Sequence, residues 1–170
     1  MTAPRWYSLY VELAATAERL LADRERGDPV FVGTGSLTVD QAKARLRIMQ
    51  AIVADWQAAR DGLPLPNPEQ ATQAEKRDTL EQAATRAAQL AAADPKNRSR
   101  ADYAELVETL LWQQQDWHGT SRVRWFHQLT LDMRAESTAR LSPSPLGGPG
   151  DPGNRLAAGG EGLSTHAQAA

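Results

Sequence analysis

The sequence contains no cysteine, and this absence excludes several kinds of protein. A chain without cysteine has no disulfide framework, no thiolate metal site and no cysteine nucleophile. It also lacks any apolar run near the roughly 20 residues that a membrane-spanning helix needs. Its first residues contain no apolar stretch typical of a signal peptide. We therefore expect neither a membrane partner nor secretion through a signal peptide.

Bulky aliphatic residues are scarce as well. Leucine, valine, isoleucine and phenylalanine make up only 30 of the 170 residues, which is close to the composition of disordered chains. Five tryptophans and a net charge of only −2 argue instead for a folded protein. The 29 alanines favour helices around a modest core. We therefore expect the chain to bury enough apolar surface only with another protein or with further copies of itself. The 19 basic and 21 acidic residues do not indicate a general polyanion binder.

Two helices are predicted in the first 62 residues. Apolar residues at helical spacing from Tyr10 predict a helix over 8–26, capped by Ser8 and ended by Gly27-Asp-Pro29. Residues 30–39 then form either a short extended piece or a packed loop. Thr38 and Gln41 match a capping box that opens a second helix, which ends near Gly62. Its apolar stripe indicates core or interaction residues, namely Leu46, Met49, Val53 and Trp56.

Three further helices are predicted after a proline-rich segment. Asn67 and Pro68 fit the start of a helix over 68–92 that is either packed through its alanines or solvated. A fourth helix opens at Ser99 with Leu110 and Trp117 on its apolar stripe. A fifth begins at Thr120 or Ser121 and reaches 141. The side chains expected to face inward from it are Val123, Phe126, Leu129 and Met133.

These elements predict an all-α protein made of two helical hairpins. We expect an N-terminal hairpin over 1–62, a stiff linker over 63–68 and a C-terminal helical region over 69–141. Residues 142–170 are rich in glycine and proline without periodicity, which predicts a disordered tail.

The segment 112–128 is the part of the sequence richest in side chains that bind ligands or take part in catalysis, namely tryptophan, histidine and arginine. It supports two interpretations. In the first, Trp117 and Trp125 fill the core beside a hairpin turn, together with Phe126, and the arginines are solvated. In the second, the segment 118–141 binds DNA, because arginines neutralise phosphates and indoles stack on bases. The residues of this nucleic-acid interpretation are Arg122, Arg124, Trp125 and Arg134.

No motif in the sequence identifies an active site. His118 and His127 with Asp116 or Asp132 supply suitable metal ligands, but their spacing fixes no common face, so surface or capping histidines are the preferred interpretation. The Gly33–Ser36 loop lacks the lysine and third glycine of phosphate-binding motifs. We therefore predict no catalytic residue, no metal, no cofactor and no enzymatic activity.

Residues 10–62 resemble a pattern found in small, uncharacterised helical proteins of phages and prophages from GC-rich bacteria. The matching features are the Tyr/Leu/Ala helix with its arginine-rich end, the Pro-Val…Gly…Leu loop, and the run Arg45-Leu-Arg-Ile-Met-Gln-Ala-Ile-Val-Ala-Asp-Trp56. Sixteen arginines against three lysines fit such a genome. The resemblance implies a phage-associated setting, in the bacterial cytoplasm or a virion, and no activity.

Two functions remain as hypotheses. The first is a non-enzymatic interaction or assembly protein, either a virion component or a binder of host proteins, that forms a homo-oligomer or docks on another protein. The alternative is a DNA-binding accessory protein that uses 118–141. The scarcity of aliphatic residues favours the first, because alanine-rich helices bury too little surface to be stable alone.

Overall fold

The described part of the chain folds into five α-helices and one very short β-hairpin. The computed structural model describes residues 3–66 and 70–141. The predicted tail over 142–170 and the predicted helix start at Asn67 and Pro68 lie outside these described residues. The all-α fold predicted from the sequence is confirmed. Among the described residues, no helix is long and apolar enough to cross a membrane.

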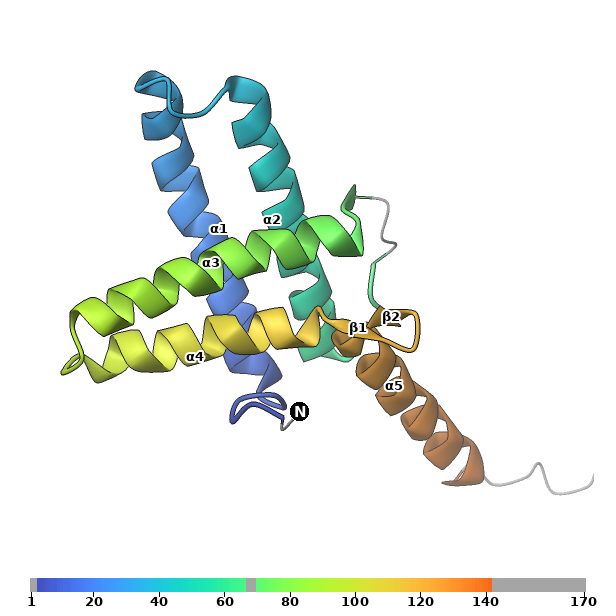
Figure 1. Cartoon of the computed structure of the whole chain (residues 1–170). Helices are drawn as coiled ribbons and strands as arrows, with labels where there is room; N and C mark the ends of the chain where they lie inside the picture. The colour runs from blue at the N-terminus through green and yellow to red at the C-terminus, as the bar shows by residue number, and fades with distance from the viewer. Residues whose placement is uncertain (1–2, 67–69, 142–170) are drawn as a thin grey trace, which may run out of the picture.

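The first two helices, α1 (Tyr10–Gly33) and α2 (Val39–Asp61), pack side by side as a hairpin (Figure 1). The capping box predicted for α2 is present, since Thr38 Oγ1 accepts from Gln41 N at 3.1 Å and Gln41 Oε1 accepts from Thr38 N at 2.8 Å. Gly62 ends α2 in the left-handed conformation that glycine adopts easily.

The predicted limits of α1 are wrong at both ends. Ser8 is not its cap, and the helix runs through Pro29 to Gly33, so residues 30–33 form neither a strand nor a loop. The helix continues because Asp28 is buried and its Oδ2 lies 3.4 Å from Arg45 Nε on α2. Packing on α2 therefore outweighs the backbone hydrogen bond that proline cannot donate.

The next two helices, α3 (Gln73–Ala93) and α4 (Arg98–Gln113), form the second hairpin. Helix α3 begins later than predicted, because residues 70–72 are not α-helical and its N-cap is Thr72, which forms a second capping box with Glu75. The N-cap of α4 is Asn97, whose Oδ1 accepts from Arg100 N, and not the predicted Ser99.

The two hairpins cross and share one core. Figure 1 shows α3 and α4 lying across α1 and α2, and the contacts join α1 with α4 and α2 with α3. Trp56 is fully buried at the crossing, 6.0 Å from the Tyr10 ring. The segments expected to fold as 1–62 and 69–141 therefore meet in a single cluster. Its largest buried members are Leu13, Met49, Ile52, Trp56, Leu80 and Leu110.

The last helix, α5 (Arg122–Leu141), follows a hairpin of β1 (Asp116–Trp117) and β2 (Thr120–Ser121). Its first turns contact α4 and the hairpin, and its remainder projects away from the four other helices (Figure 1). From Gln128 onwards no residue of α5 is buried. Helix α5 therefore carries a long, largely unpacked surface.

Candidate interaction surface

The segment 112–128 is gathered into one compact unit by a tight hairpin. Strands β1 and β2 pair antiparallel, with Trp117 opposite Thr120. The two turn residues His118 and Gly119 have φ values of 53° and 81°, as in the two-residue turns that match strand twist. The turn brings the end of α4 next to the start of α5.

Aromatic rings cover the outside of this hairpin. The Trp117 ring stacks on Phe126 at a centroid distance of 6.5 Å, and Trp125 meets Phe126 edge-on at 4.9 Å. His118 lies 5.6 Å from Trp125. Trp117 and Trp125 are both half-buried, so they lie beside the core and do not fill it as predicted.

Arg122 is buried between two indoles at the start of α5. Its guanidinium lies 4.4 Å from the Trp112 ring centroid and 4.5 Å from that of Trp117. The residue is only 8% exposed, and its Nε atom has no hydrogen-bond partner among the described residues. Attraction to the two ring faces offsets part of the loss of hydration. Arg122 is therefore part of the packed hairpin, whereas the nucleic-acid interpretation placed it on the surface.

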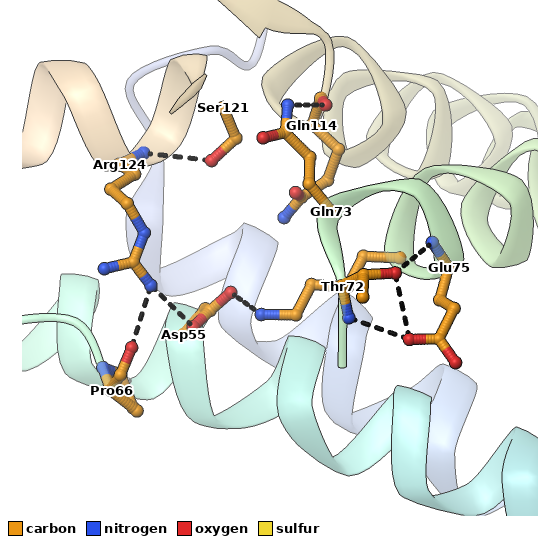
Figure 2. A network of polar contacts seen from close by, with 9 residues as sticks. Asp55, Pro66, Thr72, Gln73, Glu75, Gln114, Ser121 and Arg124 are labelled. Atoms are coloured by element: carbon orange, nitrogen blue, oxygen red, sulfur yellow. Dashed lines mark hydrogen bonds and ion pairs between the residues drawn. The ribbon is translucent and has the colours of Figure 1, made fainter. Parts of the chain in front are cut away.

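A polar network fixes the start of α5 to the rest of the fold (Figure 2). Arg124 Nη2 donates to the carbonyl of Pro66 at 2.8 Å and lies 4.0 Å from Asp55 Oδ1. The other oxygen of Asp55 accepts from Lys76 Nζ at 2.5 Å, with both side chains almost fully buried. The network joins α2, α3 and α5, and sequence reasoning did not find it. The only signal was a charged residue, Asp55, inside the apolar stripe of α2.

The start of α3 is held in the same network. Gln73 Nε2 donates to the carbonyl of Gln114 at 3.2 Å (Figure 2). It also donates to Asp116 Oδ1 at 2.9 Å. The backbone N–H of Thr72 lowers the pKa of Glu75 to about 2, together with hydrogen bonds from Arg47 and from the Thr72 hydroxyl. The N-terminus of α3 is therefore hydrogen-bonded to the hairpin that precedes α5.

The rotation of α5 about its axis is set by a buried histidine. The Nε2 atom of His127 lies 2.7 Å from the carbonyl oxygen of Leu63, and its ring meets Tyr10 edge-on at 6.4 Å. Burial raises the pKa of Tyr10. Val123 and His127 consequently face inward, both at most 2% exposed.

This rotation overturns most of the inward face predicted for α5. Val123 is buried as predicted, but Phe126, Leu129 and Met133 are 36%, 43% and 65% exposed. The prediction failed because apolar periodicity ignores the polar contacts of Arg124 and His127, which turn the apolar stripe outward. Spacings of three and four residues place the three side chains on one side of the helix, hereafter the α5 face. Arg122 lies seven residues before Leu129, so it is on the same side of α5, at the beginning of the helix.

The other predicted site residues are placed as follows. Met49, Val53, Trp56 and Leu110 are buried as predicted, whereas Leu46 is half-buried. Arg134 is exposed, and Arg124 is engaged by Pro66 and Asp55. The four residues of the nucleic-acid interpretation therefore do not form one exposed cationic surface.

The histidines do not share a site. His118 lies at the exposed hairpin turn, and His127 is turned towards the Leu63 carbonyl. In the described part of the chain, no three histidine, aspartate or glutamate residues are close enough to hold a metal ion.

A groove of about 1050 Å³, missed by sequence reasoning, opens between α1 and α3. It arises only from the crossing of the hairpins, which no local pattern reveals.

No family model matches the chain, and no curated protein or solved structure is significantly similar to it.

Proposed function

We propose that this chain is a non-enzymatic assembly protein that associates with further copies of itself through the α5 face. The observation that carries the proposal is the exposure of Phe126, Leu129 and Met133 on one side of a helix that projects from the fold. The last 14 residues of α5, Gln128–Leu141, include no buried residue. A helix of this length is marginal in water unless its apolar side is covered.

The phage-associated setting belongs to this proposal. It is supported by the resemblance of residues 10–62 and by the arginine-rich composition, both of which fit a virion component or a binder of host proteins.

The placement of the arginines favours assembly over the DNA-binding alternative. Neutralising a phosphate requires an accessible cation, whereas Arg122 is stacked between indoles and Arg124 is bonded to Pro66. DNA binding stays a prediction. It requires an affinity that falls steeply with salt and is lost in the Arg122→Ala/Arg124→Ala variant.

The assembly proposal is tested by removing the apolar side chains that are most exposed. In the double variant Leu129→Gln/Met133→Gln, hereafter the face variant, the helix is kept and the apolar surface is lost. We expect the wild type to have a mass of several copies by light scattering on a sizing column, and the face variant to approach the 18.6 kDa of one copy. About a tenfold loss of affinity per side chain is the expected scale.

A matched control carries the same two glutamines on another side of α5. Ala135 and Ala139 are exposed and lie away from the α5 face. The variant Ala135→Gln/Ala139→Gln should assemble like the wild type. A monomeric wild type at all concentrations, or a face variant that assembles normally, contradicts the proposal.

A further inference from the structure

The groove between α1 and α3 is a second exposed surface that combines apolar and charged side chains. One side of α1 lines it with Leu20, Arg24, Gly27 and Phe31, and α3 lines the opposite wall between Asp78 and Leu90. Phe31 and Leu90 are 41% and 47% exposed. A Cβ atom built at Gly27 would have only Phe31 nearby, at 3.7 Å, so the groove is open along α1 at this position.

A buried carboxylate in the groove lacks a hydrogen-bond donor. Asp28 is 2% exposed, and its Oδ2 accepts no hydrogen bond from any described residue, although Arg45 Nε lies 3.4 Å away. A buried acceptor without a donor is unfavourable, so a docked group that donates there is stabilised. Burial lowers the pKa of Arg24, with a smaller contribution from the neighbouring Arg45.

The groove carries a net negative charge, and the α5 face carries one arginine. The groove is lined by four acidic side chains and three arginines, so its formal charge is −1; the acidic ones are Asp23, Asp28, Asp78 and Glu81. The projecting part of α5 is neutral overall, but Arg140 lies seven residues after Met133 and therefore on the α5 face. The guanidinium of Arg134 is instead turned towards the end of α2, where a Cβ atom built at Gly62 would lie 3.0 Å from its Nη1 atom.

The lengths of the two surfaces also match. The groove side of α1 from Leu20 to Phe31 extends roughly 18 Å, and the projecting part of α5 from Gln128 to Leu141 extends roughly 21 Å. We propose that α5 of one copy docks into the α1–α3 groove of the next copy. Its Leu129 and Met133 then meet Phe31 and Leu90, and Arg140 reaches Asp28. This inference rests on the proposed function, because it names the surface that covers the α5 face.

The two surfaces lie far apart on one molecule. His127 anchors α5 beside Leu63, just after the end of α2, whereas Arg45 lines the groove near the beginning of α2. The distance along α2 between these points is roughly 27 Å. Two different surfaces at separate places form a heterologous contact, which repeats from copy to copy into an open chain or a ring.

Docking into the groove also buries more of the surface of α5 than pairing of two α5 helices does. Stable interfaces bury roughly 800 Å² on each partner, which a stripe of three side chains on one helix does not supply. A groove contacts α5 on two sides, so it covers more of the same helix.

The inference is tested by altering the groove without touching α5. In the groove variant, Gly27→Lys/Leu90→Lys, two lysines fill the groove and repel Arg140 of α5. The control Ala15→Lys/Ala92→Lys adds the same charge to exposed positions of the same two helices, outside the groove. We expect the groove variant to lose assembly at least tenfold while the control assembles like the wild type. Leu90→Lys alone, at an exposed position, should weaken assembly in the same direction.

Mixing the groove variant with the face variant separates the two modes of association. The groove variant keeps its α5 face, and the face variant keeps its groove. Docking of α5 into the groove therefore predicts that each is monomeric alone and that a 1:1 mixture forms a complex of two copies and nothing larger. Pairing between α5 faces predicts instead that the groove variant assembles alone and forms no complex with the face variant.

Each outcome bears on one of the two proposals. A groove variant that assembles normally, or a mixture that stays monomeric, overturns the inference and leaves assembly through α5 standing. A face variant that assembles normally overturns the proposed function and the inference with it. Circular dichroism of each variant should match the wild type.

Discussion

At the residue scale, the buried pair of Asp55 and Lys76 is the most sensitive polar contact between α2 and α3. Both side chains are 6% exposed, and Nζ lies 2.5 Å from Oδ2. Lys76→Met leaves the carboxylate buried, with Arg124 at 4.0 Å as the remaining cation. We expect this variant to lose about 3–5 kcal/mol of the free energy of unfolding, measured by urea titration.

Removing both charges provides the matched comparison. The double variant Asp55→Leu/Lys76→Met buries no charge, so it should be clearly more stable than Lys76→Met alone. If the single variant is as stable as the wild type, the pair does not fix α3 to α2.

Glu75 gives the fold a defined sensitivity to acid. Its pKa of about 2 in the folded chain lies below the usual 4.5, chiefly because the Thr72 N–H donates to the carboxylate. A lowered pKa means that this contribution to stability is complete above pH 4.5 and is lost as the pH falls from 4.5 to 2. The Glu75→Gln variant should therefore lose less stability than the wild type over that interval, measured by thermal unfolding. Parallel losses in both proteins would contradict this role.

At the element scale, a helix end could be predicted from the sequence where local chemistry decides it. The capping box at Thr38 and the glycine at Gly62 act within a few residues, and both ends of α2 were predicted correctly. The C-terminal end of α1 and the orientation of α5 are instead determined by contacts between residues far apart in the sequence. Asp28 and Arg45 carry α1 past Pro29, and the contact between His127 and Leu63 turns α5. The aromatic segment was recognisable as a candidate site, but its exposed face was not.

The proline inside α1 is a direct test of how the helix is maintained. Pro29 is exposed and cannot donate a backbone hydrogen bond to Glu25. In Pro29→Ala that bond can form, so we expect the free energy of unfolding to rise by about 1–3 kcal/mol. The measurement is urea unfolding followed by circular dichroism. A less stable variant would show that packing of α1 on α2 depends on a proline bend.

At the scale of the whole molecule, the crossing of two hairpins explains how so few aliphatic residues make a core. Leu13, Met49, Leu80 and Leu110 come from four different helices and belong to one buried cluster. Concentrating the apolar side chains at the crossing leaves the outer halves of α1 and α3 apart, which creates the groove. It also leaves α5 with too few contacts to be buried. The two proposed docking surfaces thus follow from a core that is built from few aliphatic residues at the crossing of the hairpins.

Hydrogen exchange along the full chain tests this division between core and docking surfaces. Amides near Met49 and Leu110 share the core, so they should exchange through the same global opening at every protein concentration. Amides of 128–141 should exchange quickly in dilute solution, because no residue there is buried. Assembly covers α5 and the groove, so protection of 128–141 and 20–31 should rise together with concentration. Protection that rises in 128–141 alone indicates pairing of α5 helices, and rates independent of concentration exclude assembly through α5.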